Sequence, residues 1–216
     1  MLITLLTDFG TADYFVGALK GAILSVNEGA RIFDITHDIA PHDINAAAFT
    51  LLAVYKTFPA RTIHVAVVDP GVGSARRPIL VCGGDYFFIG PDNGLFSFII
   101  ERESPCRVFH LTSKEFFRQS VSATFHGRDV FAPVAGALSK GVAAEELGEE
   151  IGDYVRLARL APKLREDGTI EAAIIHIDRF GNCITNLTPV ELTDEMIARG
   201  ARLIILSALR QLPTQN

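Results

Sequence analysis

The stretch TIHVAVVD, residues 62–69, is an uninterrupted run of β-branched and apolar residues that ends in a carboxylate. Residues of this kind favour strands, and the lack of polar alternation predicts a strand buried on both faces. Such strands are typical of parallel sheets, in which crossover helices connect the neighbours. The sequence before this strand should therefore alternate between strand and helix.

That alternation is present. Apolar stretches at residues 2–6 and 31–35 predict strands, and helical spacing of apolar residues predicts helices over 14–26 and 43–58. Asp13 stands where the N-cap of the first helix is expected. The β-α-β-α-β order predicts an α/β fold with a mostly parallel sheet flanked by helices.

Further elements follow this unit. Two short apolar runs on either side of residues 84–85 predict a hairpin. A helix is expected near residues 95–100, a strand at 106–111, and a helix over 128–140 that ends at Gly141.

The composition changes after Gly141. Residues 143–168 are charged and lack a clean strand pattern, so we expect a connecting segment there. Strand-like alternation returns at residues 169–187, and ARLIILSAL, residues 201–209, predicts one more strand. The predicted organisation is an N-terminal α/β domain, a linker and a short, incomplete β-rich C-terminal domain, with bounds 1–155, 156–167 and 168–216.

The overall composition narrows the class of protein. Of 216 residues, 49% are hydrophobic and the formal net charge is −5, which favours a large core and argues against a nucleic-acid partner. We expect no membrane span, because no apolar run is long enough, and no signal peptide. Cys82, Cys106 and Cys183 form no CxxC pattern, so a reduced, cytoplasmic setting is expected, without a disulfide framework or a zinc site.

Two aspartates follow predicted strands of the parallel sheet. Asp8 comes after the first strand and Asp69 closes the third. Ligands bind outside these strand ends in open parallel sheets, but either aspartate is also an ordinary turn residue. DPGVGSARRP, residues 69–78, is not a phosphate loop, because its glycines lead into a strand and not into a helix N-terminus.

TFHGRD, residues 124–129, places the charged or titratable side chains of His126, Arg128 and Asp129 directly before an apolar segment. His126 carries an imidazole that titrates near neutral pH, so it is either a surface histidine or part of a reaction centre. Arg128 and Asp129 are expected to form a local ion pair at a helix start. Arg77, in the earlier loop, is expected to be a solvated charge.

Five blocks occur together in order: TDFGTADYFVGALKG, VVDPGVGSARRPI, GPDNGL, SATFHGRDVFAPVA and IDRFGNCITN. No block is specific alone. Together, from Ile3 to about Leu206, the chain resembles the S-adenosyl-L-methionine hydroxide adenosyltransferase family. This family is related to fluorinating and chlorinating enzymes that act on the same substrate.

The resemblance implies an enzyme that hydrolyses S-adenosyl-L-methionine to adenosine and L-methionine, by attack of a water-derived nucleophile on ribose C5′, with no metal or other cofactor. It implies a catalytic set in which Asp69 orients its partners, Arg76 stabilises an incipient hydroxide, and His126 accepts the water proton. The implied substrate contacts are Asp8 to the ribose, Asp13 and Asp178 to the amino-acid end, and Phe180 and Asn182 to adenine. The halogenating relatives carry Tyr-Ser where this chain has His126-Gly127, so the water-using branch is the better match.

The resemblance further implies a homotrimer, with each site between the N-terminal domain of one subunit and the C-terminal domain of the next. Members of the family continue beyond residues 201–209 with more strands of a C-terminal barrel, whereas this sequence ends at LRQLPTQN. We therefore expect an incomplete pocket wall, weak substrate binding, slow turnover and a tendency to associate.

Two other functions are compatible with these residues. Asp8, Asp13, Asp69 and His126 are all metal-ligand types, so a metal-dependent hydrolase is one alternative, although the chain has no HxH or HExxH motif. A non-catalytic protein that binds adenosyl ligands is the other. Loss of activity with a chelator would favour the first, and binding without release of adenosine the second.

Overall fold

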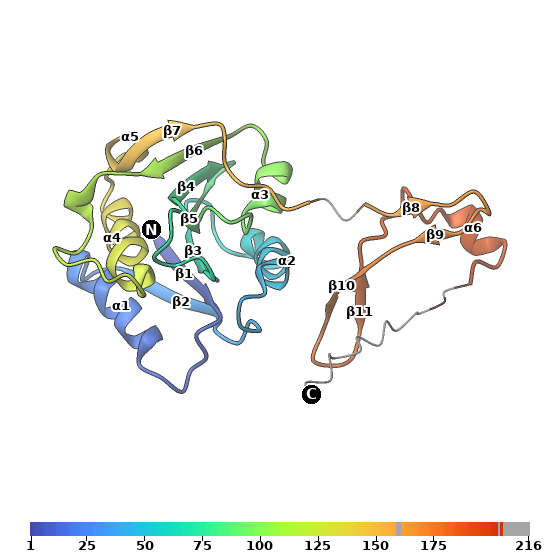
Figure 1. The fold of residues 1–216 in the computed structure, drawn as a ribbon, viewed down its shortest axis with the longest axis horizontal. Helices are drawn as coiled ribbons and strands as arrows, with labels where there is room; N and C mark the ends of the chain where they lie inside the picture. Colours follow the sequence, from blue (N-terminus) through green and yellow to red (C-terminus); the bar gives the residue numbers. More distant parts are fainter. Residues whose placement is uncertain (159–160, 203, 205–216) are drawn as a thin grey trace, which may run out of the picture. The chain divides into compact units, whose positions relative to one another are not determined.

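The computed structural model describes residues 1–158, 161–202 and 204 (Figure 1). The chain divides into two compact units, unit 1 from Met1 to Arg159 and unit 2 from Leu160 to Asn216. Unit 1 contains a large sheet with helices on its faces, and unit 2 contains short strand pairs.

Unit 1 is built around one mixed sheet. In the described residues its strand order is β2-β1-β3-β5-β4-β6-β7. The neighbours from β2 to β5 run parallel, and the pairs from β5 through β4 and β6 to β7 run antiparallel. The strands are β1 Leu2–Thr7, β2 Arg31–Thr36, β3 Ile63–Val67, β4 Pro78–Gly83, β5 Tyr86–Pro91, β6 Cys106–Leu111 and β7 Gly148–Ile151. The predicted fold class is confirmed, and so is the β4–β5 hairpin.

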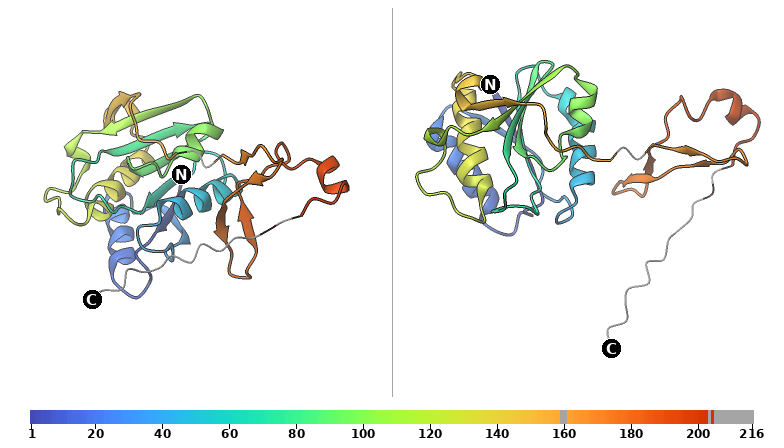
Figure 2. Two further views of the ribbon diagram at one scale, coloured as in Figure 1. Left: turned by 45° about the vertical axis from the view of Figure 1, so that its right-hand side comes forward. Right: turned by 45° about the horizontal axis from the view of Figure 1, so that its top comes forward.

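Helices cover both faces of this sheet (Figure 2). The helices are α1 Phe15–Val26, α2 Ile44–Val54, α3 Ser97–Arg102, α4 Ala132–Ser139 and α5 Ala144–Leu147. α1 and α4 pack together on one face, where Leu19 and Val134 join a buried cluster. α2 and α3 pack on the other, where Leu51 and Ile99 join a second cluster. Every residue of β3 is buried, as its uninterrupted apolar run predicts.

Several local predictions differ from the structure. Asp13 does not cap α1, because the N-cap is Tyr14 and no side chain makes the capping bond there. The helix expected over 128–140 begins with a π-helical turn, Gly127–Phe131, before α4. Gly141 lies just beyond the C-cap Lys140 with a φ of 99°, a conformation that suits glycine.

The expected connection at residues 143–168 contains α5 and the strand β7. β7 has the sequence GEEI and pairs only with β6 among the described strands. An edge strand can present charged side chains to solvent, so its sequence lacks the apolar signal on which strand prediction depends.

Unit 2 consists of short elements: β8 Lys163–Leu164, β9 Ile170–Glu171, β10 Ile174–Ile177, β11 Cys183–Thr185 and α6 Asp194–Ala198. β8 pairs antiparallel with β9, and β10 with β11. Several large apolar side chains of this unit are exposed, among them Leu164, Phe180 and Val190. The strand predicted at residues 201–209 lies mostly outside the described residues.

Gly148→Ala tests the position of β7. A Cβ at Gly148 would lie far inside 3.0 Å of the His110 carbonyl oxygen, a separation that real Cβ atoms essentially never show. Because His110 belongs to β6, relief of this clash disturbs the sheet, and we expect a loss of about 1–3 kcal/mol in the free energy of unfolding. Chemical denaturation measures the loss. The control is Gly152→Ala, where an added Cβ has no neighbour within 4 Å; equal stability of the two variants would contradict the β6–β7 pairing.

Candidate active site

The carboxyl ends of β1 and β3 form the edge at which the candidate site lies. The strands pair in parallel with Thr7 opposite Val67, and the chain continues into Asp8 and Asp69. β1 lies between β2 and β3, and the helices α1 and α2 that follow β1 and β2 cover opposite faces of the sheet. The strand order therefore reverses at β1, and open parallel sheets bind ligands at such a switch point.

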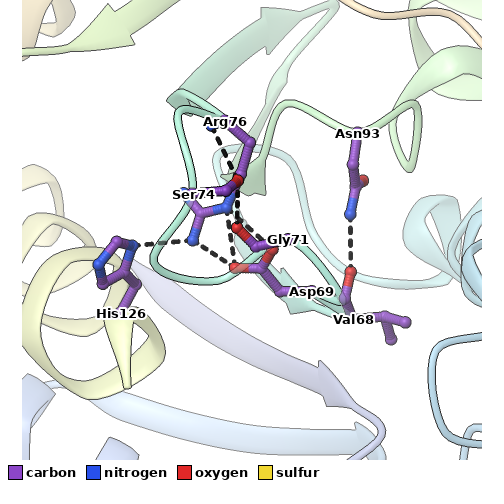
Figure 3. Close-up of polar contacts among 7 residues, drawn as sticks. All are labelled: Val68, Asp69, Gly71, Ser74, Arg76, Asn93 and His126. Atoms are coloured by element: carbon purple, nitrogen blue, oxygen red, sulfur yellow. Dashed lines mark hydrogen bonds and ion pairs between the residues drawn. The ribbon is translucent and has the colours of Figure 1, made fainter. Parts of the chain in front are cut away.

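Arg76 lies at the centre of a chain of polar contacts that Figure 3 shows. Its Nε donates to both carboxylate oxygens of Asp69 at 2.9 Å, and its Nη2 also donates to Asp69 Oδ2. The same Nη2 donates to Nδ1 of His126 at 2.9 Å. Only 8% of the Arg76 side chain and 6% of the Asp69 side chain are exposed. The structure thus brings all three residues of the expected catalytic set together.

A tight turn returns Arg76 to Asp69. Val72 N donates to Asp69 O at 3.2 Å, and both the backbone N and the hydroxyl of Ser74 donate to Gly71 O. Arg76 N then donates to the Ser74 hydroxyl oxygen at 3.2 Å. Glycine and serine are typical turn residues because glycine tolerates unusual backbone angles and the serine hydroxyl bonds to nearby backbone groups. The loop that begins at Asp69 therefore turns the Arg76 guanidinium back onto the Asp69 carboxylate.

The contact with Arg76 fixes the tautomer of His126. A guanidinium N–H can only donate, so Nδ1 of His126 must accept, and a neutral ring then carries its proton on Nε2. Burial lowers the pKa of His126 below its usual 6.5, and the positive charge of Arg76 lowers the pKa further. The neutral form is therefore the stable one near pH 7.

A pocket of about 300 Å³ opens beside this chain of contacts. Its polar lining includes Asp8, Asp69 and His126, and its apolar lining comes from Phe9, Phe15, Pro41, Val67, Val72 and Phe125. The rings of Phe9, Phe15 and Phe125 pack edge to face, with centroids 5.3 to 5.9 Å apart. The pocket therefore offers two carboxylates and an imidazole inside a largely apolar wall.

Asp8 has a structural partner as well as a place in the pocket. Its Oδ2 accepts from the backbone N of His42 at 2.9 Å, and His42 has an unusual positive φ of 67°. His42 also lines the pocket. Asp8 thus holds the chain segment that forms one wall, a role that its position after β1 does not reveal.

The remaining predicted binding residues lie elsewhere in the described chain. Asp13 is exposed and does not line the pocket. Asp178, Phe180 and Asn182 belong to unit 2, in the turn between β10 and β11. Asp178 accepts bonds from the backbone N atoms of Phe180 and Asn182 and from the Asn182 side chain at 2.6 to 2.9 Å. The Phe180 side chain is left 89% exposed.

Arg77 is not the solvated charge that the sequence suggested. Its Nε and Nη2 donate to Asp92 Oδ2 at 3.0 and 2.8 Å, and its Nη1 donates to Asp153 at 2.8 Å. The Asp92 side chain is 2% exposed and also accepts from Val155 N at 2.8 Å. Arg77 therefore ties the end of the Arg76 loop to the segment that leaves unit 1. The PDNGL block was the available sequence signal, because it contains Asp92. Its Asn93 donates to Val68 O, one residue beyond the end of β3 (Figure 3).

The predicted ion pair at the start of the helix is confirmed. Arg128 donates to both carboxylate oxygens of Asp129 at 2.7 and 2.9 Å, and Asp129 is fully buried. Asp129 also accepts from Ser122 N at 2.8 Å. These contacts lower the pKa of Asp129 against the opposing effect of burial, which is the largest single influence. The carboxylate thereby anchors the segment that leads to His126.

Within 1–158, 161–202 and 204, no group of three or more His, Cys, Asp or Glu side chains could hold a metal ion. In the same part of the chain, no helix combines the length and the apolar character that crossing a membrane requires.

Comparison with known proteins gives consistent matches. The family model of the SAM hydroxide adenosyltransferase N-terminal domain matches residues 3–148. A (R)-S-adenosyl-L-methionine hydrolase of Methanocaldococcus jannaschii is 41% identical over 197 residues, covering 89% of this chain and 69% of the relative. A fluorinase of an Actinoplanes species is 26% identical, covering 95% and 78%. The crystal structure of a conserved protein from Thermotoga maritima matches with a TM-score of 0.80 and 34% identity, covering 87% and 71%.

Arg77→Ala tests the tie between Arg77 and Asp92. The variant leaves a buried carboxylate without its cation, so we expect a loss of about 3 kcal/mol in the free energy of unfolding. The matched control is Arg107→Ala, because Arg107 also bridges two carboxylates, Glu145 and Glu150, but all three side chains are more than half exposed. That variant should lose less than about 1 kcal/mol. Equal losses of unfolding free energy for the two variants in urea denaturation would show that the buried Arg77–Asp92 pair stabilises the fold no more than the exposed pairs of Arg107.

Proposed function

The chain belongs to the SAM hydroxide adenosyltransferase family, and we propose that it hydrolyses S-adenosyl-L-methionine to adenosine and L-methionine. The relative from Methanocaldococcus jannaschii that bears this activity in its name shares 41% of the aligned residues, against 26% for the fluorinase. The structural observation that carries the proposal is a buried arginine held between Asp69 and His126 beside an apolar pocket. Neither a metal-dependent hydrolase nor a pure binding protein is favoured by these relatives.

The reaction joins an anion to a cation. A water molecule first loses a proton to solvent to give hydroxide. The hydroxide oxygen then forms a bond to ribose C5′ as the C5′–S bond breaks, and the electron pair of that bond stays on sulfur, which leaves as a neutral thioether. Charge disappears as the transition state forms, so exclusion of bulk water favours the reaction. The apolar wall around Phe9, Phe15 and Phe125 supports this environment.

Arg76 is proposed to lower the cost of forming hydroxide. Free hydroxide is scarce because the pKa of bulk water is about 15.7. A guanidinium supplies a permanent positive charge, and Asp69 fixes the orientation of Arg76 through three hydrogen bonds. Its Nη1 is buried and has no hydrogen-bond partner within the described part of the chain. A buried donor of this kind calls for a partner, and a water or hydroxide would satisfy it.

His126 is proposed to act in its neutral form. In the observed arrangement the Nδ1 lone pair accepts from Arg76, so the ring presents a donor at Nε2 and no free acceptor. The expectation that His126 accepts the water proton would require Arg76 to release Nδ1 first. We therefore assign His126 to holding Arg76 in place and to hydrogen bonding, and not to proton abstraction in this arrangement.

The other substrate contacts follow the family resemblance. Asp8 is proposed to accept the ribose hydroxyls, since it lines the pocket and one of its oxygens, Oδ1, is not used by His42. Asp13 and Asp178 are proposed for the amino-acid end of the substrate. Phe180 and Asn182 are proposed for adenine, and the large exposed fraction of Phe180 suits a ring that stacks on a ligand.

Assembly, cofactor and cellular setting are also proposals. A homotrimer is proposed from the family resemblance, and association of subunits is supported by exposed apolar side chains of unit 2, such as Leu164 and Val190, which a partner subunit would cover. No further cofactor is proposed, because Arg76 supplies the positive charge and the sulfonium is already activated to leave. A cytoplasmic setting is supported by the three cysteines, all of which are free.

Labelled water tests the proposed reaction. Purified protein incubated with S-adenosyl-L-methionine in ¹⁸O water should yield adenosine with the label at the 5′ oxygen and methionine in equal amount. Arg76→Ala should lower kcat at least about 100-fold with a smaller change in KM, because the lost charge acts mainly in the transition state. Arg107→Ala is the control with normal turnover. Unlabelled adenosine, or a halogenated nucleoside as the main product at physiological chloride, would refute the reaction.

The pH profile tests the neutral form of His126. Protonation would put a proton on Nδ1, against the Arg76 donor, so kcat should fall as the pH drops through the His126 pKa. Because burial and Arg76 lower this pKa, the midpoint of the acid limb should lie below 6.5. The charged groups that act on the ring are Arg76, Asp69 and Asp129. His126→Gln should abolish the limb and His110→Gln should preserve it; a midpoint above 6.5 would contradict the assignment.

A further inference from the structure

Arg76 and His126 come from two loops that must meet with little tolerance. Fifty positions separate them in sequence, yet the hydrogen bond from Arg76 Nη2 to His126 Nδ1 is 2.9 Å long. The first loop is the turn from Asp69 to Arg76, and the second is the segment before His126. A contact between the backbones of these two loops would set the distance between the two side chains.

Such a contact is made by Gly73. The φ of Gly73 is 77°, in the region that favours glycine. A Cβ at this position would lie far inside 3.0 Å of the Ala123 carbonyl oxygen, and at 3.3 Å from the Ala123 carbonyl carbon. Ala123 is three residues before His126. The two loops therefore touch at a point where no other residue type fits.

The second loop is held from its other side. The buried Asp129 accepts from Ser122 N at 2.8 Å, and its carbonyl oxygen accepts from Arg118 N at 2.9 Å. Thr124 N donates to the Ser122 hydroxyl oxygen at 3.2 Å. An added methyl group at Gly73 would thus push against an anchored segment, so the first loop would give way.

A shift of the first loop reaches Arg76 directly. Ser74 follows Gly73, and its hydroxyl oxygen accepts from Arg76 N while its hydrogen is donated to Gly71 O. These bonds make the turn one unit, so Gly73 and Arg76 move together. The Arg76 guanidinium would then lie farther from His126.

We propose that Gly73 is a positioning residue for the reaction: the absence of a side chain lets the loop that carries Arg76 lie against the Ala123 peptide, so that Arg76 reaches His126. The inference rests on the proposed function for its effect on turnover. Its effect on the Arg76–His126 contact is independent of that function.

The experiment compares Gly73→Ala with the unaltered protein in two readouts. Turnover of S-adenosyl-L-methionine should fall about 100-fold in kcat, as expected for a displacement of about 1 Å in a catalytic group, with little change in KM. NMR titration of the His126 ring should show its pKa rising, because Arg76 moves away while Asp69 and Asp129 remain. A purely structural defect would lower stability without moving this titration.

Two further glycine variants make the comparison strict. Gly141→Ala carries a similar backbone strain, with a φ of 99°, but its Cβ would have no neighbour within 4 Å; its activity and His126 titration should match the unaltered protein. Gly71→Ala has an ordinary φ, and its Cβ would meet the Arg76 side chain at 3.3 Å. It should show the same two effects in milder form, and it carries the test if Gly73→Ala does not fold.

The outcomes separate the inference from the proposed function. If the unaltered protein makes no adenosine but the His126 titration moves in Gly73→Ala, the proposed function fails and the positioning role stands. If the unaltered protein is active, and a folded Gly73→Ala or Gly71→Ala keeps both its kcat and the His126 titration, the positioning role is overturned.

Discussion

The buried ion pair of Arg76 and Asp69 is the interaction on which the site depends. An arginine that is 92% removed from solvent needs a carboxylate close by, because an unpaired buried charge costs several kcal/mol. Asp69 meets that need with three hydrogen bonds and still leaves Nη2 able to reach His126 and Nη1 without a partner in the described chain. The pair therefore holds a positive charge between Asp69 and His126, two residues that line the apolar pocket.

The fold supplies the two conditions for this arrangement. Parallel pairing of β1 with β3 brings Asp8 and Asp69 to one edge, at the point where the strand order reverses. Aromatic side chains from the loop after β1, from α1 and from the segment before His126 then form the apolar wall. Charged and polar side chains and a low-dielectric surrounding are thus placed together, and that combination suits the proposed reaction, in which charge is neutralised.

Much of this could be predicted from local sequence, and the rest depends on contacts between distant residues. β3 and Asp69 follow from one apolar run and its final carboxylate, and the fold class follows from the alternation around it. The prediction that Arg77 is a solvated charge was wrong because its partners, Asp92 and Asp153, lie 15 and 76 residues away in sequence. The burial of Asp92 arises only when the chain folds. β7 was missed because an edge strand needs no apolar pattern. The tautomer of His126 is likewise set by a residue 50 positions away, so no local sequence pattern indicates it.

The most direct test of this account is the protonation state of the His126 ring in the unaltered protein at neutral pH. Nitrogen-15 NMR distinguishes a ring nitrogen that carries a proton from one that accepts a hydrogen bond. We expect a neutral ring with the proton on Nε2 and an Nδ1 that accepts a hydrogen bond from the Arg76 guanidinium. A proton on Nδ1, or a doubly protonated ring at pH 7, would contradict the central claim that Arg76 is held between Asp69 and a neutral His126.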